Sequence, residues 1–184
     1  METPPQACDL ICSFSSAVAI NNIILFCGVI ATVMAIRSAK LATVATISHN
    51  REIARQTETA LSMFNSRSDR NLIDGYQTIR SIHGSDTDNI VSYATNDEKR
   101  KSPEAEKIRY ALNFWERVAV CVSHGIYCEK IIKDSMYTTV TDAFQRAQPY
   151  IKAVRDQKHS QTPYQDFEVM AMRWLADPLK GRQS

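Results

Sequence analysis

The sequence predicts an all-α protein, with one N-terminal membrane-spanning helix that continues into a stalk, followed by a bundle of about five to six helices. Three observations predict this fold class. An uncharged apolar run fills residues 17–36. The residues after it carry apolar side chains at helical spacing, and no run alternates with the period of two that marks a strand.

The composition excludes several classes of protein. The 184 residues include 22 Lys and Arg against 20 Asp and Glu, so the formal net charge is only +2. This balance gives no chain-wide basic field that would hold phosphates, and we expect no nucleic-acid partner. The 5 glycines form no cluster of the Walker or dinucleotide type. Nucleotide enzymes of those classes are therefore excluded, and we expect no cofactor.

The apolar run AVAINNIILFCGVIATVMAI, residues 17–36, is long enough to cross a bilayer as a helix. At ~1.5 Å per residue such a helix reaches roughly 30 Å. No Lys or Arg precedes the run, whereas a cleaved signal peptide needs positive charge before a shorter apolar core. We therefore expect an uncleaved anchor. The alternative is a core helix of a soluble protein, because Asn21 and Asn22 would need partners in hydrocarbon.

The charges flanking the span predict its orientation. Cations follow it at Arg37, Lys40, Arg51 and Arg55, and none precedes it. Because positive charge near a span is retained in the cytoplasm, residues 1–16 should form a short extracytoplasmic N-terminus. The helical body should be cytoplasmic, and the lipid bilayer is the first expected partner.

Small residues within the span predict self-association. Asn21, Gly28 and Thr32 recur at helical spacing, and Gly28 with Thr32 forms the small-x-x-x-small pattern that lets two helix backbones approach closely. A homo-oligomer is expected from this face; the alternative is that these residues face lipid. Cys8 or Cys12 would cross-link neighbouring subunits in an oxidising compartment, or would stay free.

Residues 37–66 are expected to form a helical stalk, since 38–65 contain neither Gly nor Pro. Ile47, Ala54 and Leu61 recur every seven residues, but polar side chains interrupt this seam. The stalk should therefore be a poor coiled coil that packs against the body.

The body is expected to span residues 67–177. Its first half begins with a helix that Asp69 caps and that ends at Gly84. A further helix is expected over about residues 86–95, and the charged segment 96–102 should be a solvated loop. The strongest local signal is Ser102 followed by Pro103, an N-cap and a first-turn proline, which open a helix that closes near Gly125.

The second half of the body should contain three more helical segments. Residues 126–134 form a short one, and a separate helix begins at Thr138 or Thr139 and is kinked by Pro149. Thr162 has capping-box spacing for a last helix that Pro178 stops, and residues 178–184 are a tail.

The run LNFWERVAVCVSHGIYCEKIIKDSMYTTVTDAFQRAQPYIKAVR, residues 112–155, followed by PYQDFEVMAMRWL, resembles the bacterial family known as domain of unknown function 4760. The similarity extends to RQTETAL, residues 55–61. The chain departs from the family where an acid tends to follow the Gly-Ile turn, since Cys128 precedes Glu129. The resemblance implies membrane anchorage and an α-helical body, and it implies no activity. We expect a single-pass protein of a bacterial inner membrane.

Cys121, His124 and Cys128 are the candidates for a metal site, because thiolate and imidazole ligands lie around one helix end. A fourth ligand is not evident and the spacing matches no finger signature. We therefore expect reduced core cysteines, a surface or capping histidine, and no metal. A nucleophilic Cys-His pair meets the same objection, since no third group orients it.

Asn113, Glu116 and Arg117 form the candidate polar site beside Trp115. A buried carboxylate there would act as a general base or a ligand-binding group. The alternative is a structural glutamate that binds a neighbouring helix terminus or an arginine. A basic stretch on a later helix is expected to be a solvated face because acids are mixed into it; it comprises Arg146, Lys152, Arg155 and Lys158.

These features favour a membrane-tethered helical interaction or sensing module that is not an enzyme, self-associates and has an unidentified protein partner. No catalytic residue is assigned. One alternative is an oligomeric membrane effector that perturbs the bilayer in bacterial or phage conflict, supported by Asn21, Asn22 and Gly28. The other is a hydrolase that uses Glu116 or His124.

Overall fold

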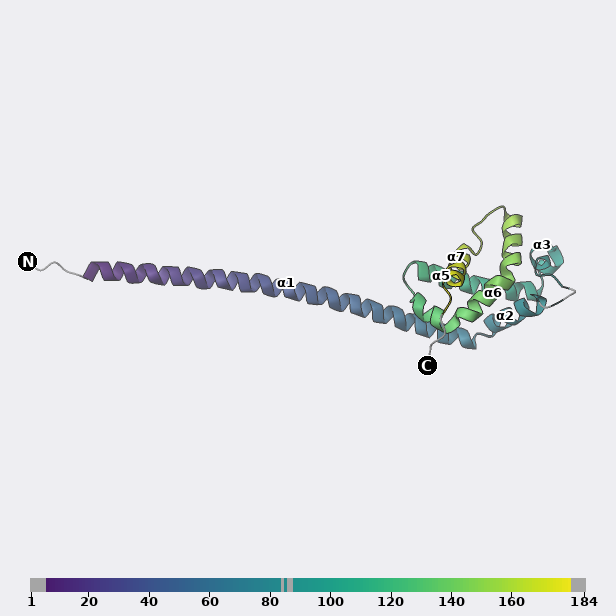
Figure 1. Ribbon diagram of the computed structural model, residues 1–184, viewed down its shortest axis with the longest axis horizontal. Coiled ribbons are helices and arrows are strands. Elements are labelled where there is room, and N and C mark those ends of the chain that lie inside the picture. Colours follow the sequence, from purple (N-terminus) through teal and green to yellow (C-terminus); the bar gives the residue numbers. More distant parts are fainter. Residues whose placement is uncertain (1–5, 84, 86–87, 180–184) are drawn as a thin grey trace, which may run out of the picture. The chain divides into compact units, whose positions relative to one another are not determined.

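The structure, a computed structural model, describes residues 6–83, 85 and 88–179, with side chains described from Leu25 onward. These residues form seven α-helices and no strand (Figure 1), which confirms the all-α fold class. The helices are α1 (Gln6–Ser68), α2 (Arg70–His83), α3 (Ser92–Thr95), α4 (Asp97–Arg100), α5 (Pro103–Ser123), α6 (Glu129–Lys158) and α7 (Gln165–Ala176).

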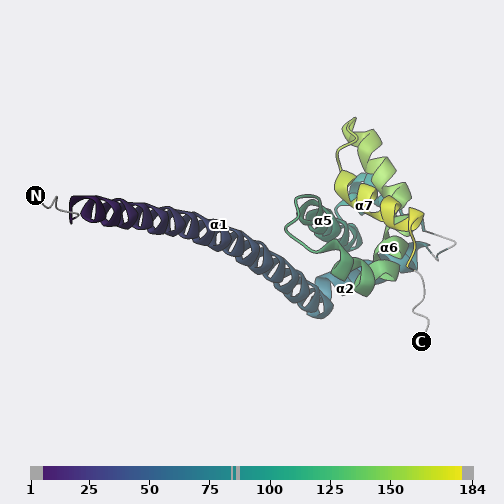
Figure 2. The ribbon, with the colours of Figure 1, turned by 60° about the vertical axis from the view of Figure 1, so that its left-hand side comes forward.

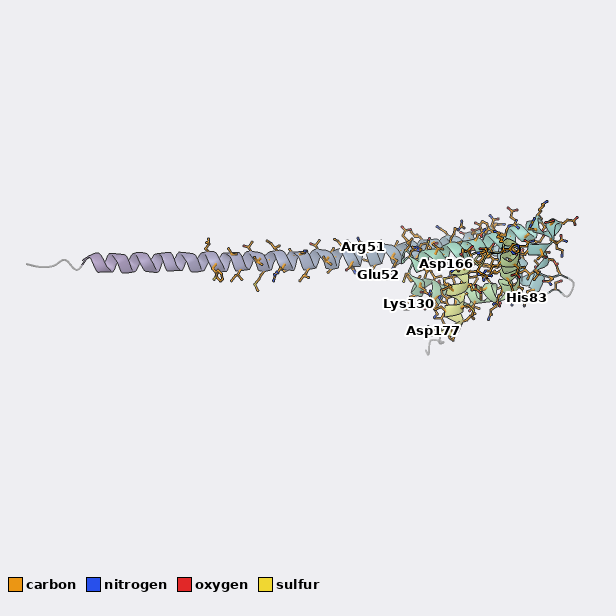
Figure 3. All side chains as sticks on the ribbon, turned by 90° about the horizontal axis from the view of Figure 1, so that it is seen from above. Arg51, Glu52, His83, Lys130, Asp166 and Asp177 are labelled. Carbon is orange, nitrogen blue, oxygen red and sulfur yellow. The ribbon has the colours of Figure 1, made fainter. Side chains whose placement is uncertain are left out.

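The chain divides into two units, Met1–Arg51 and Glu52–Ser184, and α1 contributes to both. The predicted continuation of the apolar helix into a stalk without a break is confirmed. In the first unit the described side chains are exposed and project from the helix as separate sticks (Figure 3). The hydroxyls of Thr32, Thr43 and Thr46 donate to carbonyls one turn back, at 2.8, 2.9 and 2.9 Å. These polar groups therefore find partners within their own helix.

In the second unit the end of α1 packs into the core, as expected of the stalk. The residues that do so are Thr59, Met63 and Ser66, which are buried. The apolar residues that recur every seven positions lie on a different face of α1 from these buried residues, since Leu61 is 53% exposed. The packing surface of this segment therefore combines hydroxyl side chains with the apolar Met63, and it is not the seven-residue apolar seam.

Helix α2 begins as predicted. The Asp69 carboxylate accepts hydrogen bonds from the backbone N–H groups of Asn71 and Leu72, at 3.0 and 3.2 Å. The helix ends at His83, and the predicted end at Gly84 lies outside the described residues. Gly75 lets α2 approach α5 closely, because a Cβ at this position would lie 2.6 Å from the carbonyl oxygen of Lys107.

The core of the second unit lies among α2, α5, α6 and α7 (Figure 2). Trp115 on α5 and Phe167 on α7 stack with ring centroids 6.5 Å apart, and Phe144 of α6 meets the Phe167 ring edge-on at 5.6 Å. All three side chains are at most 1% exposed. The aromatic contacts therefore join α5, α6 and α7.

The expectations for residues 86–102 need correction. Of the helix expected over about residues 86–95, the described residues form only α3, Ser92–Thr95. Asn89 accepts a hydrogen bond from the N–H of Val91 at 2.9 Å, and Asp88 accepts one from the Tyr93 hydroxyl at 2.6 Å. Such side-chain bonds compete with helix formation. The expected loop instead holds the short helix α4, because Asn96 caps it by accepting from two backbone N–H groups.

Helix α5 runs from Pro103 to Ser123 with Ser102 as its N-cap, as predicted, and Gly125 follows it with φ of 68°. The two helical segments expected over residues 126–154 are instead one helix, α6. Its buried residues Ile132, Val140 and Phe144 follow one stripe across the expected break. The C-terminal part of α6 takes a different direction from its N-terminal part (Figures 1 and 2), and Pro149 lies inside the helix.

Candidate functional site

Glu116 projects from α5 to the beginning of α7 and caps that helix. Its two carboxylate oxygens accept hydrogen bonds from the backbone N–H groups of Phe167, at 2.8 Å, and Asp166, at 3.3 Å. The first N–H groups of a helix have no partner within it and carry partial positive charge, so a carboxylate is a suitable acceptor. Of the two interpretations of Glu116, this geometry matches the structural partner that binds a helix terminus.

This cap replaces the one expected from Thr162. The residue that precedes α7 is Tyr164, which has φ of 58° and makes no side-chain cap. The carbonyl of Thr162 accepts from the N–H of Gln165 at 3.2 Å, which places Thr162 in the turn before the helix. The capping-box spacing was therefore the wrong signal, because the cap comes from another helix.

Burial raises the pKa of Glu116 above its ordinary value, because the carboxylate loses water. The hydrogen bonds from Phe167 and Asp166 act in the opposite direction, as does the charge of Arg155. The nearby Asp166 carboxylate adds to the increase. The protonated form of Glu116 is therefore stabilised in the folded protein relative to water.

The other two members of the candidate polar site do not join Glu116. Asn113 and Arg117 are exposed on α5, whereas Glu116 is half-buried against α7. The three residues thus face different surroundings, and the cap of α7 is made by Glu116.

Arg155 on α6 is a polar residue that the sequence placed only in an exposed basic stretch. Only 11% of its side chain is exposed, so the expectation of a solvated basic face was wrong for this member. Its Nη1 lies 2.6 Å from an oxygen of Glu168 on α7, and its Nε donates to the Pro163 carbonyl at 3.0 Å. Its Nη2 is buried and has no hydrogen-bond partner. No local sequence pattern marks this role, because it depends on how α6 and α7 meet.

The weak metal candidates are not brought together as a site. Cys128 is buried, Cys121 is half-buried and His124 is exposed. The Nδ1 atom of His124 lies 2.9 Å from the Val120 carbonyl and 3.1 Å from the Ser123 hydroxyl. Within the described part of the chain, no three His, Cys, Asp or Glu side chains are grouped so that they could hold a metal ion.

The span-packing residues are only partly described. Gly28 and Thr32 lie on one exposed face of α1, and a Cβ at Gly28 would meet nothing within 4 Å. The side chains of Asn21, Cys8 and Cys12 lie outside the described residues. The predicted helix-packing role of this face stays a prediction.

Comparison with known proteins gives one family. The family model for the domain of unknown function (DUF4760) matches residues 22–174, from within the apolar run to Trp174 of α7. No curated protein and no solved structure shows significant similarity to the chain. The family match covers more than half of the sequence and includes most of α1 and the helical body. The chain therefore belongs to the DUF4760 family of domains of unknown function.

Proposed function

We propose that this protein is a membrane-tethered helical interaction module, not an enzyme, which self-associates at a bacterial inner membrane. The observation that carries the proposal is the exposure of the apolar part of α1. The helix is long and apolar enough to cross a membrane, and none of its most apolar 18-residue window is buried. Leu25, Phe26 and Met34 are 71%, 67% and 67% exposed. A bilayer is the natural cover for such a surface.

This exposure favours an anchor over the two competing explanations. A core helix of a soluble protein would bury these residues against other elements. A cleaved signal sequence would not belong to the mature domain, yet the family match begins at residue 22, inside the apolar run. Arg37 and Lys40 follow the run, which supports an external N-terminus and a cytoplasmic body.

Self-association is supported by an unpartnered face in the second unit. Ile53, Leu61 and Phe64 project from one side of α1 and are 48%, 53% and 68% exposed. The opposite side holds the buried Thr59 and Met63. We propose that a second copy of this chain packs against the exposed face. Two copies anchored in one bilayer meet at high local concentration, and a two-fold axis would pair the same face on both.

The anchor is tested by membrane extraction. Full-length protein should remain with the membrane pellet after an alkaline wash, and a Val29→Lys, Val33→Lys variant should be released. A C-terminal reporter that is active only in the cytoplasm should be active. Release of the unaltered protein by the wash would contradict anchorage, and an inactive reporter would contradict the orientation.

Self-association is tested by the mass of the full-length protein in detergent. The unaltered protein should be an oligomer, and a Leu61→Glu, Phe64→Glu variant should have a smaller mass. The matched control is Gln157→Glu with Lys158→Ala, which changes net charge equally at exposed positions on α6. The proposed interface would be contradicted if the unaltered protein were monomeric in detergent, or if the two variants had equal masses.

A further inference from the structure

A pocket of about 480 Å³ opens in the second unit beside the C-terminal half of α6. Its polar lining is Gln148, Lys152, Arg155 and Asp156 of α6, Gln161 of the connection to α7, and Glu168 of α7. Pro149 and Ile151 supply an apolar part of the wall. The volume lies within the range of about 300–1,000 Å³ that is typical of small-molecule sites.

The guanidinium of Arg155 gives this pocket an unmet hydrogen-bonding requirement. Two of its three nitrogens have partners, Glu168 and the Pro163 carbonyl, whereas Nη2 is buried without one. An unpaired donor on a cation is costly, because the hydrogen bond that water made to it has been lost. An acceptor atom supplied by a ligand would restore that bond after a small shift of the side chain.

The charges of the lining select the class of ligand. Lys152 and Arg155 are cations, and Asp156 and Glu168 are anions, so the formal charge of the empty pocket is zero. A dianionic phosphate would leave two uncompensated negative charges beside two carboxylates. A single carboxylate leaves one, and its oxygens match the donors of Arg155 and Lys152.

We propose that this pocket binds a small organic acid through its carboxylate, with Arg155 and Lys152 as the donors. Pro149 and Ile151 contact the short hydrocarbon part of the ligand. Asp156 accepts from an ammonium or hydroxyl group, where the acid carries one. This inference goes beyond the proposed function and does not depend on membrane anchorage, because every residue that carries it belongs to the second unit.

The test uses full-length protein in detergent with ¹³C-labelled isoleucine methyl groups, and it follows the methyl signal of Ile151. The probes are acetate and glycine, the smallest carboxylate and its ammonium-bearing counterpart, with inorganic phosphate and chloride at equal ionic strength. Acetate or glycine should shift the Ile151 signal saturably. Phosphate and chloride should not.

Two variants locate the binding. Lys152→Gln removes one donor from the exposed side of the pocket, and it should weaken binding by about ten-fold. Arg155→Lys keeps a cation beside Glu168 but has no counterpart of the Nη2 donor. This variant should show no saturable shift with acetate or glycine. The matched control is Lys158→Gln, which makes the same charge change on α6 outside the pocket and should bind as the unaltered protein does.

The proposal is overturned if neither carboxylate gives a saturable shift, or if both variants bind as tightly as the control. Saturation by phosphate without saturation by acetate or glycine overturns the class of ligand. None of these results bears on anchorage or self-association, which are measured by extraction and by mass.

Discussion

The hydroxyl of Thr59 accepts a 2.7 Å hydrogen bond from the backbone N–H of Cys128, 69 residues further along the chain. The same hydroxyl donates to the carbonyl of Arg55 at 2.6 Å. Thr59 is fully buried, and Cys128 is the residue that precedes α6. One side chain thus attaches the end of α1 to the start of α6 and satisfies a backbone donor that water does not reach.

Replacing Thr59 by Val should destabilise the second unit by about 1–3 kcal/mol, because the N–H of Cys128 loses its partner while the shape of the side chain is kept. Urea unfolding of the full-length protein, followed by circular dichroism, measures the change. The control is Thr57→Val, two residues away on the exposed side. Equal midpoints for the two variants would show that this bond contributes nothing to stability.

The Tyr76 hydroxyl accepts a 2.7 Å hydrogen bond from the indole N–H of Trp115. Trp115 is 0% exposed, so Tyr76→Phe leaves a buried donor without an acceptor. We expect a loss of about 1–3 kcal/mol in the free energy of unfolding and a change in tryptophan fluorescence. Tyr127→Phe, at another partly buried tyrosine, is the control. An unchanged unfolding curve for Tyr76→Phe would contradict the role of this bond.

Gly75 permits the close approach of α2 and α5. A Cβ there would lie 2.6 Å from the Lys107 carbonyl oxygen and 2.7 Å from the Cβ of Ala111. Alanine raises helix propensity by about 1 kcal/mol, but forcing two backbones apart costs about 1–3 kcal/mol, so Gly75→Ala should destabilise or be neutral at best. A thermal melt compares it with Ser81→Ala on the exposed side of α2. A clear increase in melting temperature would contradict the packing.

The helix starts that the sequence predicted correctly have their cause within a few residues. Asp69 and Ser102 cap the helices that follow them, because the acceptor and the N–H groups are at most three positions apart. The sequence also contained evidence that α6 is unbroken, since Ile132, Val140 and Phe144 lie on one stripe. We nevertheless predicted two helices there, because Thr138 is typical of a helix start. Tyr137 stacks on Trp174 with ring centroids 6.4 Å apart, a tertiary contact that holds this part of α6 in place.

The parts of the candidate site that the sequence did not predict depend on distant partners. Glu116 was recognised as a candidate, but the N–H groups that it caps lie 50 and 51 residues away. Arg155 looked like part of a charged surface because acids surround it in sequence. Its burial follows from the meeting of α6 with α7, which no spacing along α6 reveals.

The cap at α7 predicts a pH dependence. The folded-state pKa of Glu116 is raised by burial above its ordinary value of 4.5, so the folded state holds this proton more tightly than the unfolded state. The contribution of Glu116 to stability is therefore fully present below pH 4.5 and is lost as the pH rises through the raised pKa. The Glu116→Gln variant has no ionisable group at this position, so its stability does not decrease with pH for this reason.

The difference in unfolding free energy between the unaltered protein and Glu116→Gln should therefore fall as pH increases above 4.5 and then become constant. Urea unfolding at a series of pH values measures it. The control is Glu106→Gln, which makes the same substitution at an exposed position on the same helix. A difference that stays constant across this window, or that rises with pH, would mean that the hydrogen bonds from Phe167 and Asp166 outweigh the burial of the carboxylate.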